Sequence, residues 1–301
     1  MSKILHIFLV FLFSCIIFSC GEKEESKEES TTTTSAQVLC NSCMGGSIQG
    51  IELSLSTSVS TLAGTFPFPG REDSHSDGTG TSASFEYPSG ITTDGTNLYV
   101  ADTSNHLIRK IVISTGAVTT LAGTGSSGSA NGTGTSASFN YPEGITTDGT
   151  NLYVTDRSNH LIRKIVISTA VVTTLAGTGF AGSNDDASCG ATGGCIGSES
   201  WFRYPSRITT DGTNIYVTDL GNHRIRKIVI SSSNEGGHGF YNRVSTVAGT
   251  ASTDGFTCCT SGSADNSTGT SASFNTPKGI TTDGTNLYVT DLNNNLIRKI
   301  E

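Results

Sequence analysis

The ten-residue stretch ITTDGTNLYV at positions 91–100 decides the fold, because it returns three more times along the chain. It recurs at 145–154 and 280–289, and at 208–217 with Ile215 in place of Leu. Each copy is followed by a second shared segment that ends in Ile-Arg-Lys-Ile, at 108–111, 162–165, 225–228 and 297–300. Self-similar units of this length are the sequence signature of repeat architectures.

Within one repeat, four short runs read as strands separated by turn residues. In the first copy they are 90–94, 97–102, 107–113 and 118–122, and they are β-branched or alternate between apolar and polar residues. The two-residue connection Gly95-Thr96 places Gly where a hairpin turn needs a positive φ. Each repeat is therefore expected to form one antiparallel sheet of four strands, and such sheets repeated radially form a β-propeller.

The segments Asn105-His106-Leu107 and Asn159-His160-Leu161 resemble the NHL repeat, which is named for these three residues and forms a propeller blade. The resemblance covers residues 59–301 and implies a β-propeller, and the four copies predict an all-β, four-bladed β-propeller. The family more often builds six blades, so the alternatives are one small ring and two chains that combine; the matched ends favour a ring within one chain. The fourth unit has three strands, and Val59–Gly64 repeats the motif of the fourth strand. We therefore predict that this N-terminal strand completes the last blade and closes the ring, which removes the open edges.

Composition narrows the possible functions. Gly accounts for 36 of 301 residues and charged residues for 15%, with a net charge of −8. Charged residues are usually about 25% of a globular protein, so turns dominate here and long exposed helices are not expected. The acidic balance argues against a protein that binds nucleic acid through its phosphates, and no nucleic-acid partner is predicted.

The N-terminus reads as an export signal. Residues 1–19 hold Lys3 followed by an apolar run, and the segment Ile17-Phe18-Ser19-Cys20 resembles the lipobox of bacterial lipoproteins, with Cys20 as the lipidated residue. An uncleaved anchor and an ordinary secretion signal are the alternatives. Residues 20–47 form a charged, Thr-rich stretch that cannot pack a core and is expected to be a flexible tether. The predicted propeller domain is 48–301, held in the bacterial cell envelope by its lipid, in the periplasm or on the surface of the outer membrane.

Charged residues recur in each repeat at a fixed spacing. If the second and third strands pair across the turn, each Asp lies diagonally opposite an Arg, within reach of its side chain. We expect ion pairs inside the blades rather than a charged binding ring, and we expect His106, His160 and His223 to pack between blades rather than to bind a metal. No metal or cofactor site is predicted. The expected pairs are Asp102–Arg109, Asp156–Arg163, Asp219–Arg226 and Asp291–Arg298.

Six cysteines remain beyond Cys20 and the signal segment, and an even number in an exported chain indicates disulfides. Cys189–Cys195 is the favoured pair; Cys40 and Cys43 could form a local bridge, and Cys258 and Cys259 could pair with each other or with the N-terminal tail.

The connections between blades are long and share one face of the propeller, and loops on a rigid scaffold commonly carry function. The third connection departs most from the repeat. Two interpretations of Trp201, the single Trp, stay open: an anchor for a partner, or packing between blades. The candidate binding residues are Trp201, Arg203, Tyr204, Arg207, Asp185 and Asp186.

We therefore expect an envelope lipoprotein that binds a protein or glycan through this face. The alternative is an extracytoplasmic propeller enzyme of the lyase or hydrolase type with an axial site, for which the sequence shows no constellation.

Overall fold

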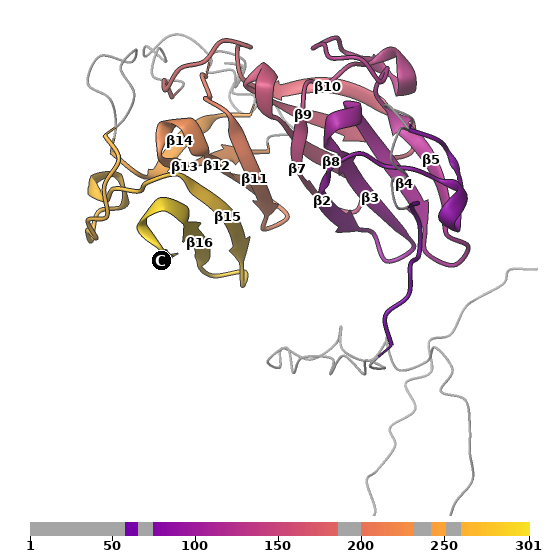
Figure 1. The fold of residues 1–301 in the computed structure, drawn as a ribbon. Coiled ribbons are helices and arrows are strands. Elements are labelled where there is room, and N and C mark those ends of the chain that lie inside the picture. The colour runs from indigo at the N-terminus through magenta and orange to yellow at the C-terminus, as the bar shows by residue number, and fades with distance from the viewer. Residues whose placement is uncertain (1–57, 66–74, 186–199, 231–241, 251–259) are drawn as a thin grey trace, which may run out of the picture. The chain divides into compact units, whose positions relative to one another are not determined.

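The computed structural model describes residues 58–65, 75–185, 200–230, 242–250 and 260–301. These residues form four antiparallel sheets, joined by loops and short 3-10 turns (Figure 1). The prediction of an all-β, four-bladed propeller is confirmed. In the part of the chain that is described, the search for an apolar helix of membrane-spanning length gives no candidate.

In each blade the main strands lie side by side in the order in which they follow in the chain. Blades 1 and 2 carry an additional two-residue strand, β1 or β6, paired with their fourth strand. Blade 1 consists of β1 (Gly78–Thr79), β2 (Pro88–Thr93), β3 (Asn97–Asp102), β4 (Leu107–Val112) and β5 (Ala117–Ala122); blade 2 of β6 (Gly132–Thr133), β7 (Pro142–Thr147), β8 (Asn151–Asp156), β9 (Leu161–Val166) and β10 (Val171–Ala176). Blade 3 consists of β11 (Pro205–Thr210), β12 (Asn214–Asp219), β13 (Arg224–Val229) and β14 (Val244–Ala248), and blade 4 of β15 (Pro277–Thr282), β16 (Leu287–Asp291) and β17 (Leu296–Ile300).

The repeated Asp-Gly-Thr-Asn turn fixes the first hairpin of each blade. In blade 3, Asp211 Oδ1 accepts hydrogen bonds from the backbone N–H groups of Thr213 and Asn214, and Oδ2 accepts from the Asn214 amide and the Tyr216 hydroxyl. Gly212 adopts a φ of +89°, which glycine reaches without strain. The turn therefore sets the register of β11 against β12 from within a few residues of sequence.

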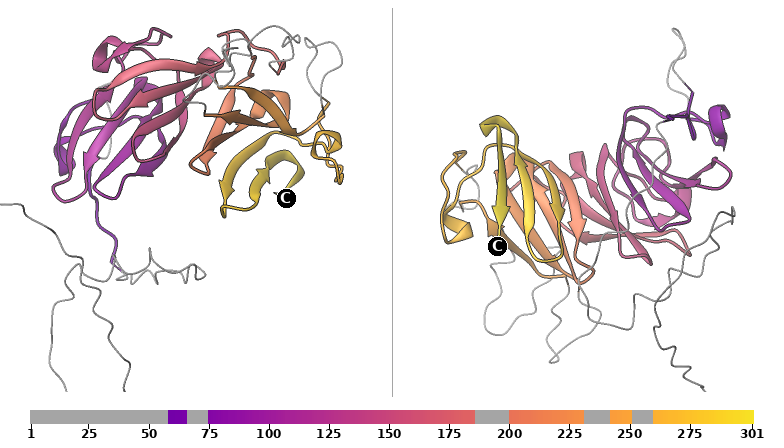
Figure 2. Two further views of the ribbon diagram at one scale, coloured as in Figure 1. Left: turned by 180° about the vertical axis from the view of Figure 1, so that it is seen from behind. Right: turned by 90° about the horizontal axis from the view of Figure 1, so that it is seen from below.

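Blades pack on one another through their first strands: β2 on β7, β7 on β11, and β11 on β15 (Figure 2). Threonines bridge these junctions, as when the Thr155 hydroxyl donates to the Ser206 carbonyl at 2.6 Å. A Cβ added to Gly144 would lie 2.5 Å from that same carbonyl oxygen, so glycine permits the close approach of β7 and β11. Buried apolar side chains fill the space between neighbouring sheets; between blades 1 and 2 they include Tyr99, Ile108, Phe139 and Leu152.

The predicted closing strand is wrong for this structure. The last sheet contains β15, β16 and β17, whereas the segment Ser58–Gly64 lies on blade 1, where the Gly64 N–H donates to the Gly80 carbonyl at 3.0 Å. The segment belongs to no sheet in this structure, and the contacts that hold it come from the blade that follows it in the chain. Blades 1 and 4 lie at opposite ends of the row of sheets (Figure 1).

Several predictions concern residues outside those described: the signal segment 1–19, the lipidated Cys20 and the tether 20–47, Asp186, and the cysteines at 40, 43, 189, 195, 258 and 259.

Candidate functional site

The recurrent Asp and Arg side chains lie together inside each blade. In blade 2, both side chains of the pair are fully buried, and Arg163 Nη1 lies 2.8 Å from Asp156 Oδ2. Burial raises the pKa of the Asp156 carboxyl, while hydrogen bonds from Asn159, the Asn140 N–H and Arg163 act against that rise. The other three pairs have separations of 2.8–3.0 Å: Asp102–Arg109, Asp219–Arg226 and Asp291–Arg298.

The histidine of the motif ties one blade to the next. His106, His160 and His223 all adopt left-handed backbone conformations, and each ring accepts a hydrogen bond at Nδ1 from a backbone N–H of the following blade. The donors are Tyr141 at 3.0 Å, Tyr204 at 3.1 Å and Thr276 at 2.9 Å. Burial lowers the pKa of each of these histidines, which favours the neutral ring that the hydrogen bond requires. These histidines therefore have a structural role.

A charged cluster occupies the junction of blades 2 and 3, on the face that carries the inter-blade loops. This junction cluster consists of Glu143, Arg157, Tyr204, Ser206 and Arg207. Glu143 is its centre: Oε1 accepts a hydrogen bond from the Ser206 hydroxyl at 2.8 Å, and Oε2 lies 3.1 Å from Arg157 Nε. Arg207 Nη1 donates to the Glu143 carbonyl at 2.8 Å. The guanidinium of Arg157 also lies over the Tyr204 ring, 5.3 Å from its centroid.

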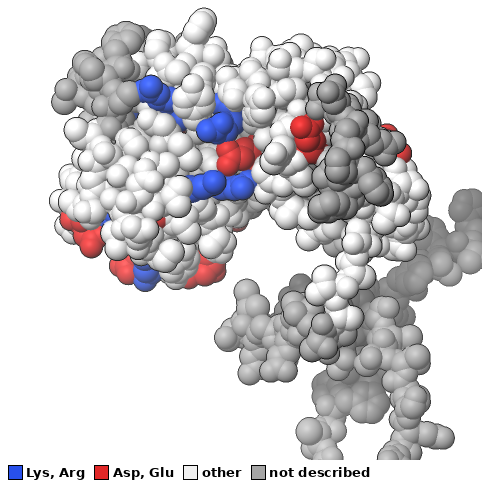
Figure 3. All heavy atoms as spheres, in the orientation of Figure 1, with Lys and Arg blue, Asp and Glu red and all other residues white. Residues whose placement is uncertain are grey.

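The cluster is accessible and carries an excess of positive charge. The side chain of Arg157 is 39% exposed and that of Arg207 is 29% exposed, and one carboxylate serves both. Burial lowers the pKa of the neighbouring His160, and the positive charges of Arg203 and Arg157 lower it further. The face seen in Figure 3 shows basic side chains beside acidic ones near its centre, surrounded mostly by uncharged surface. A pair of held but exposed guanidinium groups suits a carboxylate or another anion, which they can bind with two hydrogen bonds.

The predicted binding residues divide between this site and the blade interior. Tyr204 and Arg207 belong to the junction cluster, and Arg203 adjoins it. Trp201 instead covers Gly182, where a Cβ would collide with the indole ring, and its carbonyl accepts a hydrogen bond from Arg226. Asp185 forms an ion pair with Arg226 at 2.6 Å and accepts from Thr246, so it extends the buried network.

Sequence reasoning missed Glu143, Arg157 and Ser206. The signal that points to Glu143 and Arg157 is their departure from the repeat. Glu143 stands where the other copies have Ser or Lys, and Arg157 stands where they have Thr or Leu. Residues that recur in the copies hold the blade together, whereas these are specific to one junction.

Among the residues that the structure describes, no group of three His, Cys, Asp or Glu side chains is placed to hold a metal ion.

Residues 139–165 match the NHL repeat. The match runs from Phe139 through most of β9 in blade 2 and includes Asn159, His160 and Leu161. NHL repeat-containing protein 2 of Gallus gallus is 35% identical over 121 residues, which are 40% of this chain and 16% of that protein. The chain thus spans a small part of that relative's length.

Two solved structures are similar in fold. An auxiliary nutrient binding protein from Bacteroides thetaiotaomicron superposes with a TM-score of 0.51 at 20% identity, over 70% of this chain and 47% of that one. Another auxiliary nutrient binding protein, from Bacteroides ovatus, gives 0.52 at 17% identity, over 73% of this chain and 49% of that one. The chain therefore covers about half of each, and the likeness concerns the propeller fold.

Proposed function

We propose that this protein is a lipid-anchored envelope propeller that binds an anionic protein or glycan through the junction cluster of blades 2 and 3. One observation carries the proposal: charged side chains that break the internal repeat gather at one accessible junction. The residues that recur in every copy form contacts within the blades, whereas Arg157 and Arg207 are specific to this junction and are partly exposed.

The chemistry of the cluster suits a ligand with carboxylate groups. Glu143 orients Arg157 from one side, and the Tyr204 ring supports its guanidinium from the other. An arginine fixed in this way loses less conformational entropy when it binds a planar anion. The nutrient-binding roles named for the two similar propellers agree with a binding module, and the N-terminal sequence supports export and lipidation at Cys20.

The test measures binding of the purified full-length chain in detergent to immobilised polygalacturonate and poly-glutamate, with neutral dextran as the blank. Arg157→Ala/Arg207→Ala should weaken binding to one of the two polyanions at least tenfold, about 1.4 kcal/mol. Lys110→Ala/Lys164→Ala removes the same charge from β4 and β9 and is the matched control. Equal weakening by both double variants would indicate attraction by net charge alone and would refute a site at this junction.

A further inference from the structure

The two ends of the row of sheets differ in a complementary way: among the described residues, blade 4 lacks a fourth strand, and a segment with the sequence of a fourth strand lies unpaired beside blade 1. In the described part of the chain, β17 is an edge strand of a three-stranded sheet. At the other end, Ser58–Gly64 has the sequence of a fourth strand and belongs to no sheet. We call this segment the N-terminal arm.

The arm sits on blade 1 in the way that the fourth strands of blades 1 and 3 sit on the blades after them. Its Gly64 N–H donates to the Gly80 carbonyl at 3.0 Å; Gly123 donates to Gly134 at 3.2 Å and Gly249 to Gly269 at 3.1 Å. The arm thus occupies the fourth-strand position of a blade that would precede blade 1. Its Val59 is 100% exposed, whereas the equivalent Val118, Val172 and Val244 are at most 2% exposed.

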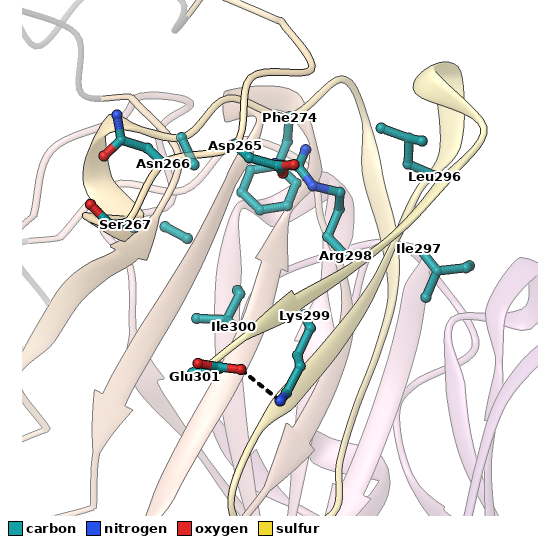
Figure 4. Close-up of a pocket in the computed structure, with 13 residues that line it drawn as sticks. Asp265, Asn266, Ser267, Phe274, Leu296, Ile297, Arg298, Lys299, Ile300 and Glu301 are labelled. Carbon is teal, nitrogen blue, oxygen red and sulfur yellow. Dashed lines mark hydrogen bonds and ion pairs between the residues drawn. The ribbon is translucent and has the colours of Figure 1, made fainter.

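The open edge of blade 4 has a groove where a fourth strand could pair with β17. A groove of about 660 Å³ runs beside β17, lined by Ala248, Phe274 and residues of β17 (Figure 4). Ile297 is 74% exposed, whereas its equivalents Ile108, Ile162 and Ile225 are fully buried. Those three isoleucines pack against the next blade, where they contact the cores around Phe139, Phe202 and Phe274, whereas no described blade follows blade 4.

A polar group in the groove also points to a missing strand. Asp265 pairs with Arg298 at 2.6 Å, yet its side chain is 92% exposed. In blade 1 the equivalent Asp77 pairs with Arg109 and additionally accepts a hydrogen bond from Thr120 of the fourth strand at 3.0 Å. In blade 3, Asp185 accepts from Thr246 at 2.9 Å. The position of Asp265 is therefore suited to a threonine hydroxyl from a strand that β17 lacks here.

We propose that the N-terminal arm of one copy of this protein pairs with β17 of a second copy and completes its blade 4. The register follows from blade 1, where Arg109 lies opposite Thr120 and Ile111 opposite Val118. Transferred to the arm, it sets Thr61 opposite Arg298 and beside Asp265. It likewise sets Val59 opposite Ile300 and Ala63 opposite Ile297.

Exposed apolar residues also lie on the outer faces of blade 1 and blade 4, the two faces that would meet. Tyr87 and Ile91 of blade 1 are exposed, whereas Ile145 and Ile208 at the position of Ile91 are buried against the preceding blade. On blade 4, Leu292 and Leu296 are exposed. Head-to-tail contact would bury these apolar groups and bring the Tyr87 backbone to Asn295, which occupies the position of the histidines that accept the same N–H elsewhere.

A second copy suits the geometry better than the same chain. The arm is already held on its own blade 1, and the first strands of blades 1 and 4 share no packing of the kind that joins consecutive blades. Head-to-tail pairing leaves the arm in place and continues the contact that joins blades 1 to 2, 2 to 3 and 3 to 4. Such a heterologous interface forms a closed ring if its rotation closes and a filament if it does not.

The first test measures the molar mass of the detergent-solubilised full-length chain by light scattering over a concentration series. We expect assemblies of two or more copies that dissociate on dilution. Ile297→Lys and Val59→Lys should each raise the dissociation constant at least tenfold, since a charge would be buried in the interface. Val171→Lys, at an exposed apolar position of β10 in blade 2 and so away from both ends, is the matched control. Because Ile297 and Val59 are exposed in the single chain, neither change should unfold the blades, which circular dichroism verifies.

The second test identifies the strand that pairs. A benzoylphenylalanine photo-crosslinker at position 59 is introduced into a mixture of ¹⁵N-labelled and unlabelled chains. Crosslinked peptides that join 59 to β17 and contain one labelled and one unlabelled partner are expected; the same probe at position 118 should crosslink within a chain to β4. A single-chain mass at every concentration, a 59-to-β17 crosslink confined to one chain, or an unchanged dissociation constant for Ile297→Lys would overturn the proposal.

Discussion

Blade 2 differs from the other blades in the number of carboxylates around its buried arginine, and this difference allows a sharp prediction. Arg163 is fully buried and lies 2.8 Å from Asp156; its second guanidinium nitrogen donates to the neutral Asn131 and to the Ala130 carbonyl. In blade 1 the equivalent Arg109 has two carboxylates, Asp102 and Asp77, each at 2.9 Å. Asp156→Asn thus leaves a buried guanidinium with no counterion.

We expect Asp156→Asn to lower the free energy of unfolding by about 3–5 kcal/mol, the cost of leaving one partner of a buried ion pair uncompensated. Asp102→Asn, a change of the same kind at a fully buried site, leaves Arg109 paired with Asp77. It should therefore cost about 1.5–3 kcal/mol, the value of a hydrogen bond to a charged group. The isosteric substitution opens no cavity in either case.

The assay is guanidinium chloride unfolding at pH 8, followed by circular dichroism, with the free energies compared at a common slope. Adding Asn131→Asp to Asp156→Asn should recover stability, because it returns a carboxylate to Arg163. If the two single variants lose equal stability, or if Asn131→Asp gives no recovery, the number of counterions does not govern the stability of these blades.

Two further predictions concern the junctions between blades. The pKa values of His106, His160 and His223 are lower in the fold than in the unfolded chain, so their contribution to stability is complete above a pH of about 6.5 and is lost as the pH falls below it. The midpoint of denaturant unfolding should therefore drop between pH 7.5 and 5.5, and His160→Gln should reduce that drop. An equal drop in the variant and the parent protein would contradict a neutral structural ring. Gly144→Ala should lower the free energy of unfolding by about 1–3 kcal/mol, because the added Cβ has no room at the Ser206 carbonyl. An unchanged denaturation midpoint would show that β7 and β11 can move apart without a loss of stability.

Hydrogen bonds at the first-hairpin turns predict a second acid-sensitive contribution to the stability of the fold. Burial raises the pKa of Asp211, but the hydrogen bonds from Asn214, Thr213 and Tyr216 outweigh it and lower the pKa to about 2. A carboxylate whose pKa is lower in the fold stabilises above its unfolded value of about 3.9, and that contribution is lost as the pH falls toward 2. We therefore expect the turns to lose stability at a lower pH than the histidine contacts.

The repeated sequence determined the strands, the hairpins and the pairing of Asp with Arg, because these contacts form within one repeat. Asp102 opposite Leu107 follows from the turn between β3 and β4, and the same turn recurs in every blade. The placement of the N-terminal arm and the gathering of Glu143, Arg157 and Arg207 were decided by tertiary structure. Both depend on how one sheet packs against the next, and that packing is set by whole faces of side chains and by close approaches such as that at Gly144. A motif can therefore name the strand that a segment forms, while the surfaces on either side decide which blade receives it.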